Sequence, residues 1–120
     1  MKRLSIAALF AFSTAFSSMA HAADAKVIPF VKKGVDPLIV LNITSLVASE
    51  LDFMGAYDDV EQLEDYPGGY SLSCLSKTSC MRTVGKALGS DFVLAGSVGA
   101  GSEAFDVYMV LFDVNQGTFV

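Results

Sequence analysis

The clearest hydrophobic pattern in the chain predicts a helix in its second half. The apolar positions recur at three- and four-residue spacing, typical of one buried helix face; they are Met81, Val84 and Leu88. We expect Thr78 to cap this helix, because a threonine side chain accepts a hydrogen bond from a free N–H of the first turn. Gly89 follows the last apolar position, and glycine is the residue that most often ends a helix.

Two strands joined by a tight turn follow this helix. Residues 92–98 are almost continuously apolar, residues 99–102 have the sequence GAGS, and residues 105–114 are rich in aromatic and β-branched side chains. This order is typical of a β-hairpin. Gly96 stands inside the first strand, which indicates a close backbone approach or a bulge.

The pattern between residues 26 and 63 predicts a strand, a helix and a second short strand. Lys26–Val31 is the strand, in which Pro29 indicates an edge or a bulge, and residues 32–35 form a turn. Asp36 followed by Pro37 is typical of a helix start, and the apolar positions after them extend the helix to about residue 53. Residues 57–63 have apolar positions three apart, which fits a short strand and a helical turn alike.

Residues 64–73 contain a Pro-Gly-Gly sequence and predict a loop. The whole order predicts an α/β fold of the mixed (α+β) kind: a small mixed β-sheet of about four to five strands with two helices packed on it. We expect both helices to cover the same face of the sheet.

Residues 1–22 have the pattern of a signal peptide. Lys2 and Arg3 precede an apolar stretch, and Ala20-His21-Ala22 has the small-x-small form that a signal peptidase cleaves, so we expect cleavage between Ala22 and Ala23. An uncleaved anchor is the alternative, but a span needs roughly 20 apolar residues and serines interrupt this stretch. We therefore expect a periplasmic or secreted protein with one domain over residues 23–120 and no transmembrane span in the mature chain.

Charge and histidine content exclude several functions. Residues 1–22 hold two of the eight basic residues and none of the thirteen acidic ones, so the remainder has six basic residues, thirteen acidic ones and a net charge of −7. Such a surface is a poor partner for nucleic acid. The single histidine, His21, lies in the predicted signal, which excludes Ser-His-Asp and Cys-His catalysis in the mature chain.

The remaining motifs do not predict an enzyme. Residues 58–65 hold five carboxylates, which suit acid–base work or a calcium site, but their spacing differs from the twelve-residue calcium loop and favours a solvated edge. The glycines near Lys86 and in residues 96–101 lack the context of a phosphate-binding loop. We therefore expect no catalytic residue, no cofactor and no metal.

The mature chain contains two cysteines, Cys74 and Cys80. An exported protein with an even number of cysteines favours a disulfide, whereas a metal site lacks further ligands. We expect this bond to hold the preceding loop on the helix that follows and to stabilise the fold by roughly 2 to 2.5 kcal/mol.

Short motifs in the second half resemble the exported bacterial domains of the TolB N-terminal-like, CsgG-like and LpoB-like group. They are ALGSD at 87–91, FVLAGSVG at 92–99 and FDVNQGTFV at 112–120. The resemblance covers most of residues 26–120 and implies a mixed α/β domain of the cell envelope that acts through protein contacts. In that group a further strand and often a helix follow the turn at residues 115–118, so we expect a C-terminally incomplete domain or one completed by another chain.

The resemblance and the exclusions together predict a non-enzymatic envelope domain, an accessory or scaffold component of a complex. We expect binding through an unpaired sheet edge along Phe105–Val114. Alternatives are a small-ligand sensor that uses the crevice beside residues 96–101, and an oligomeric subunit of an outer-membrane secretion or assembly system. Tyrosines beside the Pro-Gly-Gly loop bind partners or, as we favour, cover the sheet edge. The candidate partner-binding residues are Tyr66, Tyr70, Phe105, Tyr108 and Val110.

Overall fold

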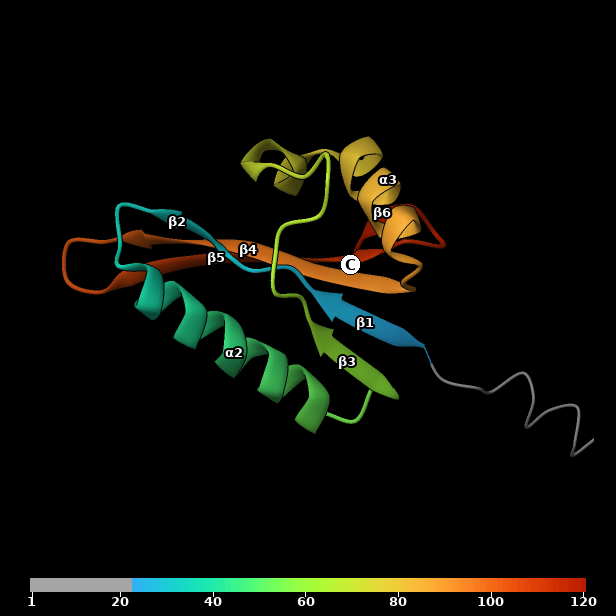
Figure 1. Cartoon of the computed structure of the whole chain (residues 1–120), viewed down its shortest axis with the longest axis horizontal. Coiled ribbons are helices and arrows are strands. Elements are labelled where there is room, and N and C mark those ends of the chain that lie inside the picture. The colour runs from blue at the N-terminus through green and yellow to red at the C-terminus, as the bar shows by residue number, and fades with distance from the viewer. Residues whose placement is uncertain (1–22) are drawn as a thin grey trace, which may run out of the picture.

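The computed structural model describes residues 23–120, which form a mixed β-sheet lying between two α-helices (Figure 1). The elements in chain order are β1 (Asp24–Val27), β2 (Val31–Lys33), α2 (Pro37–Phe53), β3 (Asp59–Gln62), the 3₁₀ helix η1 (Leu72–Ser76), α3 (Thr78–Leu88), β4 (Phe92–Ala100), β5 (Phe105–Asp113) and β6 (Thr118–Phe119). This arrangement confirms the predicted fold class. The signal-peptide prediction, including Ala22 of the cleavage site, lies outside the described residues.

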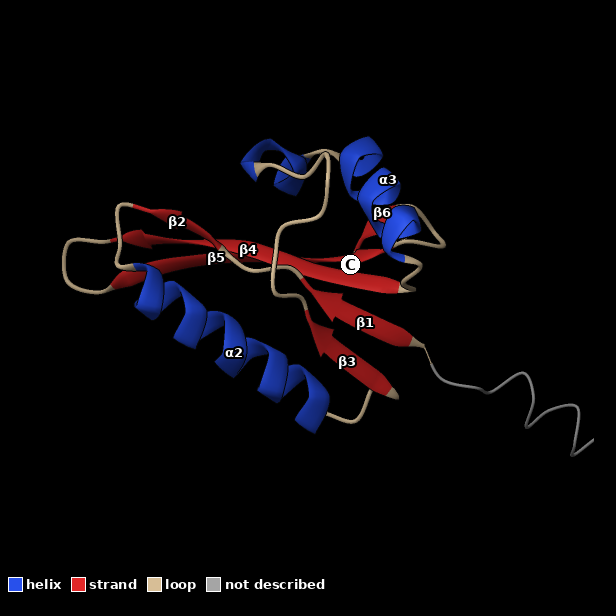
Figure 2. Ribbon diagram, viewed as in Figure 1, coloured by secondary structure: helices blue, strands red, loops and turns tan. Residues whose placement is uncertain are grey.

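The strands run in the order β3-β1-β4-β5-β6, and β2 pairs with β4 beyond the end of β1 (Figure 2). β1 is parallel to both of its neighbours, whereas β5 is antiparallel to β4 and β6. Residues 59–62 form β3, so the strand interpretation of that ambiguous segment is correct. The parallel pairs join segments far apart in sequence, while β4 and β5 form a local hairpin.

The strand predicted over Lys26–Val31 is interrupted by a bulge at Pro29. Val27 is opposite Leu94 and Val31 is opposite Ser97, so the β1–β2 segment carries one residue more than the stretch of β4 beside it. Proline lacks the N–H that a continuous ladder needs, which explains the break. Residues 32–33 belong to β2, so the prediction that they form a turn is wrong.

The two helices lie on opposite faces of the sheet, so the prediction that both cover one face is wrong (Figure 1). The reason lies in β4, whose successive side chains point to alternate faces. The cluster packed with α3 comprises Ile28, Cys74, Leu75, Met81, Val84, Val93, Ala95, Phe112 and Val114. The cluster packed with α2 comprises Ala25, Val27, Phe30, Val40, Ala48, Leu51, Leu94 and Val98.

The helix ends follow the predicted signals except at the start of α3. The Asp36 carboxylate accepts a hydrogen bond of 2.9 Å from the Leu38 N–H and caps α2. Gly89 ends α3 with a φ of 66°, a left-handed conformation that glycine adopts without strain. Thr78 is not the cap: it is the first residue of α3, and Lys77 occupies the cap position without a side-chain hydrogen bond.

Gly96 lies where two segments leave no room for a side chain. A Cβ atom at this position would collide with the backbone carbonyl oxygen of Tyr108 on β5 and would lie 3.1 Å from the Phe30 ring. The predicted close backbone approach is therefore confirmed. At Gly99, on the same strand, the nearest atom to an added Cβ would be the Lys33 Cβ at 3.6 Å, an ordinary contact.

We expect Gly96→Ala to destabilise the domain by about 1–3 kcal/mol, because the added methyl group must displace backbone or an aromatic ring. Gly99→Ala is the matched control and should change the free energy of unfolding by less than about 0.5 kcal/mol. Urea denaturation of both variants measures the difference. Equal stability of the two variants would show that β4 and β5 are not as close at Gly96 as described.

Candidate functional site

The outer edge of β5 is only partly paired. β5 pairs with β4 along its whole length, but β6 pairs only with Phe112 and Asp113. One further hydrogen bond, 2.8 Å long, joins the Val120 N–H to the Leu111 carbonyl oxygen. Within residues 23–120, the outer edge between Phe105 and Val110 has no backbone partner.

Two hydrogen bonds and one close contact show which backbone groups point outward along this edge. The carbonyl oxygen of Leu111 points to the β6 side, whereas the carbonyl of Ala104 accepts from Gly101 in the hairpin loop and that of Tyr108 lies against Gly96 of β4. Backbone groups alternate in direction along an antiparallel strand. The N–H and C=O groups of Phe105, Val107 and Met109 therefore point away from β4 and are unpaired in the described part of the chain.

The side chains of the same three residues form an exposed apolar stripe, which we call the β5 stripe. Leu111 packs against the α2 cluster. Successive side chains of a strand point to opposite faces, so every second residue before Leu111 lies on the same α2 side of the sheet. These residues are Phe105, Val107 and Met109. Their exposed fractions are 49%, 43% and 52%. α2 packs mainly over β3 and β2, so it leaves the β5 stripe uncovered.

The predicted partner-binding residues of β5 do not form one surface. Phe105 belongs to the β5 stripe, whereas Tyr108 and Val110 point to the α3 side, where Val110 packs half-buried against the α3 cluster. The prediction missed Val107 and Met109. Counting along the strand in steps of two from Phe105 would have found both.

The two loop tyrosines hold the loop onto the sheet. The Tyr66 hydroxyl donates a hydrogen bond of 2.9 Å to the Phe30 carbonyl oxygen, and its ring stacks on that of Tyr70 with centroids 5.9 Å apart. Tyr70 packs against the α3 cluster, and its hydroxyl is buried without a hydrogen-bond partner among the described residues. Burial, with a smaller contribution from Tyr66, raises the pKa of Tyr70 to about 12. These contacts suit the covering role that the sequence favoured; partner binding by the two tyrosines stays a prediction.

Cys74 and Cys80 are joined in a disulfide with their Cα atoms 5.2 Å apart. Cys74 lies in η1 and is buried in the α3 cluster, whereas Cys80 lies in the first turn of α3. The bond therefore holds η1 on α3, as the sequence predicted. No free cysteine remains in residues 23–120.

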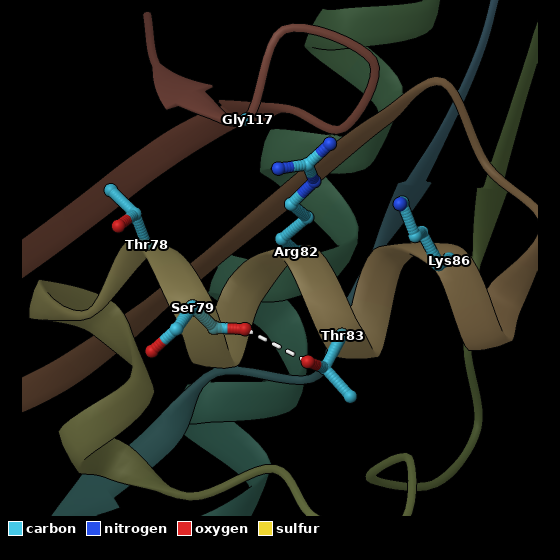
Figure 3. Close-up of a pocket in the computed structure, with 6 residues that line it drawn as sticks. All are labelled: Thr78, Ser79, Arg82, Thr83, Lys86 and Gly117. Atoms are coloured by element: carbon cyan, nitrogen blue, oxygen red, sulfur yellow. Dashed lines mark hydrogen bonds between the residues drawn. The ribbon is translucent and has the colours of Figure 1, made fainter.

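A shallow cationic groove runs along α3 beside the β5–β6 turn (Figure 3). It has a volume of about 530 Å³, and Thr78, Arg82 and Lys86 point from α3 toward the side of Gly117. Neither Arg82 nor Lys86 forms an ion pair within residues 23–120. Because all the α3 side chains that line the groove are exposed, we interpret it as a solvated face of the helix. The sequence prediction missed this pair because it considered only adjacent basic residues.

Two other places predicted from the sequence are present without further support. A pocket of about 280 Å³ lies beside the β4–β5 turn, lined by residues that include Lys33, Asp106 and Tyr108, and its role as a ligand crevice stays a prediction. In the acidic segment, Glu61 accepts a hydrogen bond of 2.9 Å from Lys26, which raises the pKa of the lysine.

The described residues contain no cluster of three potential metal ligands. None of the helices in residues 23–120 is long and apolar enough to cross a membrane.

Solved structures that align with this fold include a TolB, a PelC and an LpoB. TolB from Acinetobacter baumannii aligns with a TM-score of 0.56 and 17% identity over 82% of this chain and 21% of its own. The PelC dodecamer from Paraburkholderia phytofirmans gives 0.52 and 19% over 82% of this chain and 66% of its own. LpoB from Escherichia coli gives 0.50 and 15% over 84% of this chain and 55% of its own.

This chain has a TolB/LpoB-like fold. At these levels of identity the likeness concerns the fold, and the chain spans about a fifth of TolB and about two thirds of PelC. No model of a known protein family matches the chain, and no curated protein sequence matches it.

We expect replacement of both cysteines by serine to lower the free energy of unfolding by roughly 2 kcal/mol, because the unfolded chain regains the entropy that the short loop removes. Thermal or urea unfolding of oxidised wild type and of the double variant measures this loss. Alkylation of the oxidised, natively exported protein without reduction should leave both cysteines unlabelled. Two labelled thiols in that sample would contradict the bond.

The raised pKa of Tyr70 predicts a loss of stability at high pH. The folded state favours the neutral phenol of Tyr70, and this preference contributes to the free energy of unfolding. The contribution is complete below the pKa of the unfolded tyrosine, about 10, and is lost as the pH rises toward 12. We expect Tyr70→Phe to have a smaller loss than wild type over this interval. At neutral pH the same variant should be about as stable as wild type, because the buried hydroxyl has no partner to lose among the described residues.

The measurement is the free energy of unfolding from urea titrations at a series of pH values between 7 and the alkaline limit of the folded state. Tyr108→Phe removes a hydroxyl from an exposed tyrosine and is the matched control. An alkaline loss in Tyr70→Phe equal to that of wild type would contradict the assignment to Tyr70.

Proposed function

We propose that this protein is an exported, non-enzymatic domain of the bacterial cell envelope that binds another envelope polypeptide through the outer edge of β5. The observation that carries the proposal is the coincidence of two features at the same residues. Phe105, Val107 and Met109 direct unpaired backbone groups outward, and their side chains form the exposed β5 stripe.

Strand addition uses both features. A partner strand would pair with the outward N–H and C=O groups, which supplies affinity, and alternate side chains would contact the β5 stripe, which supplies selectivity. Proteins usually protect such an edge with lysine, proline, a bulge or a covering segment. Between Phe105 and Val110 there is neither lysine nor proline, and Asp106 is the one charged residue.

The export of the domain is supported by the signal-peptide pattern of residues 1–22, with cleavage between Ala22 and Ala23, and by the disulfide, which persists in oxidising compartments. The fold is that of TolB, PelC and LpoB. A role as an accessory or scaffold component of an envelope complex follows from strand addition. The absence of histidine from residues 23–120 supports a non-enzymatic role.

A second candidate function is that of a subunit in an oligomeric envelope assembly. The PelC structure with this fold is a dodecamer. An unpaired strand edge suits assembly from identical chains as well as capture of a different one.

We expect Met109→Pro to abolish partner capture while the domain stays folded. The Met109 N–H points outward, so proline at this position removes a donor from the free edge and none from the β4–β5 ladder. Val110→Pro differs, because the Val110 N–H points to β4 and its loss should destabilise the hairpin. Crosslinking yield to envelope proteins, measured beside circular dichroism, tests this difference.

Tyr108→Ala is the matched control for Met109→Pro. It removes a side chain of similar exposure from the opposite face and leaves every outward backbone group in place, so capture should be retained. Unchanged capture by a folded Met109→Pro variant would overturn strand addition at this edge. Turnover of any substrate by the purified wild type would overturn the non-enzymatic role.

A further inference from the structure

We infer that the cationic groove along α3 binds the acidic segment, residues 58–65, of a second copy of this chain in a head-to-tail contact. This inference rests on the second candidate function, an oligomeric envelope assembly, and names the two surfaces that meet in it. It follows from where the charges of β3 and α3 lie and from which of them are paired.

The basic residues of the chain are concentrated at α3. Three of the six basic residues in 23–120 lie in α3 or at its cap, namely Lys77, Arg82 and Lys86. Arg82 and Lys86 are one helical turn apart and line the groove beside Gly117 (Figure 3). All three are exposed, and none forms an ion pair within residues 23–120. The groove therefore holds solvated cations that the described part of the chain does not neutralise.

One carboxylate, that of Asp91, lines a hollow that shares Arg82 and Lys86 with the groove. Its oxygens accept hydrogen bonds of 3.1 Å from the Asp24 N–H and from the Asn115 side chain. It forms no ion pair with either cation. Asp91 thus serves the backbone of β1 and the turn after β5, and it leaves the two cations available to an anionic partner.

The opposite charge is concentrated at the other edge of the sheet. Residues 58–65 hold five of the thirteen acidic residues and no basic one. All five are exposed, and only Glu61 forms an ion pair within residues 23–120, with Lys26. β3 comes first in the strand order and pairs with β1 alone, so this segment follows one margin of the sheet. It is a solvated anionic strip, complementary in charge to the groove.

Both surfaces lie on the same side of the sheet. Val60 packs against the α2 cluster, so its neighbours Asp59 and Glu61 point to the α3 side. The groove lies beside the β5–β6 turn, near the edge opposite to β3 (Figure 1). A second copy placed beside the first, without being turned over, therefore brings its acidic side chains to the level of α3.

The spacing of the charges also matches. Arg82 and Lys86 are about 6 Å apart along the helix axis, because each residue of an α-helix rises 1.5 Å. Asp59 and Glu61 are about 7 Å apart along β3 and point the same way. A segment lying along the helix can therefore form two ion pairs at once. The planar guanidinium suits a two-pronged contact with one carboxylate, and the lysine ammonium can bind the other as a point charge.

The contact joins two different surfaces, so each copy offers one of each kind. Such contacts close into a ring or continue as a filament, and association should pass beyond a dimer as the concentration rises. Exposed ion pairs each contribute little free energy, so a single contact should be weak and should dissociate on dilution.

Carbodiimide coupling tests the contact directly. The reagent joins a carboxylate to an amine where the two touch, so it should link Lys86 to a carboxylate of residues 58–65. A mixture of isotope-labelled and unlabelled protein shows by mass spectrometry that the link joins two copies. Lys26 and Glu61, 2.9 Å apart within one copy, are the positive control. Lys33, exposed and outside the groove, is the matched control and should give no such link above background.

Exchange of charges tests the pairing of the two surfaces. Arg82→Glu with Lys86→Glu reverses the groove, and Asp59→Lys with Glu64→Lys reverses the acidic segment. Glu61 is left in place because it forms an ion pair within its own copy. In sedimentation equilibrium, each double variant alone should associate at least about tenfold more weakly than wild type, because like charges then face each other. An equimolar mixture of the two should recover association, because each reversed surface meets its complement.

Two further double variants are the matched controls. Lys32→Glu with Lys33→Glu, and Glu50→Lys with Glu103→Lys, make the same changes of charge at exposed positions outside both surfaces. Both should associate as wild type does, which separates the effect of the surfaces from that of net charge. All four double variants replace exposed residues and should remain folded, as circular dichroism checks.

Each outcome distinguishes the inference from the proposed function. Links from Lys86 between copies, together with recovery in the mixture, support the inference. A wild type that is monomeric at every concentration overturns it, as does association that neither reversal weakens or a mixture that stays dissociated. Association that survives both reversals would leave the second candidate function standing on other surfaces. Capture of a different envelope protein that Met109→Pro abolishes would leave the proposed function intact in every case.

Discussion

The fold depends on β4, a strand that must be apolar on both of its faces. Val93 and Ala95 supply one cluster with α3, while Leu94 and Val98 supply the other with α2. β4 also pairs with β1 and β2 along one edge and with β5 along the other. β4 contributes buried side chains to the clusters under both helices, so a change in β4 affects both halves of the core.

Close approach between packed elements sets the second constraint, and glycine meets it at Gly96 and at Gly85. A Cβ on Gly96 would collide with β5, and one on Gly85 of α3 would collide with the Val114 side chain. The domain thus gains tight contact between α3, β4 and β5 at positions where no side chain fits. α2 packs mainly over β3 and β2, so within residues 23–120 the α2 side of β5 is left exposed.

Local signals in the sequence were sufficient for most elements. Asp36-Pro37 located α2, Gly89 located the end of α3, and the two glycine-separated runs located the hairpin. The continuous apolar run of residues 92–98 also carried the signal for helices on both faces, since a strand buried on one face would alternate. The predicted cap of α3 is wrong by one residue. The Lys77 carbonyl oxygen accepts the first hydrogen bond of the helix, 3.1 Å long, from the Met81 N–H, and the Lys77 side chain gives no capping signal.

The candidate site was only half predictable, for a physical reason. Sequence pattern identified β5 as a strand with an open edge, but which alternate residues direct their backbone groups outward depends on the register with β4 and β6. That register is fixed by the turn at residues 101–104 and by the bond from Val120 to Leu111. Sequence composition therefore suggested Tyr108 and Val110 as partner-binding residues. The strand register instead shows that Val107 and Met109 direct their backbone groups outward.

The strand order also has a consequence for the order in which the sheet can form. β1 pairs on both sides with strands that come later, and its first N–H, that of Asp24, donates to an Asp91 carboxylate oxygen 67 residues further along. β3 comes before β4 in the chain, so β1 gains one neighbour early and the other only after about thirty further residues. Of the pairs in the main sheet, only those within β4–β5–β6 join segments close in sequence, so closing the sheet around β1 depends on long-range pairing, which is slow.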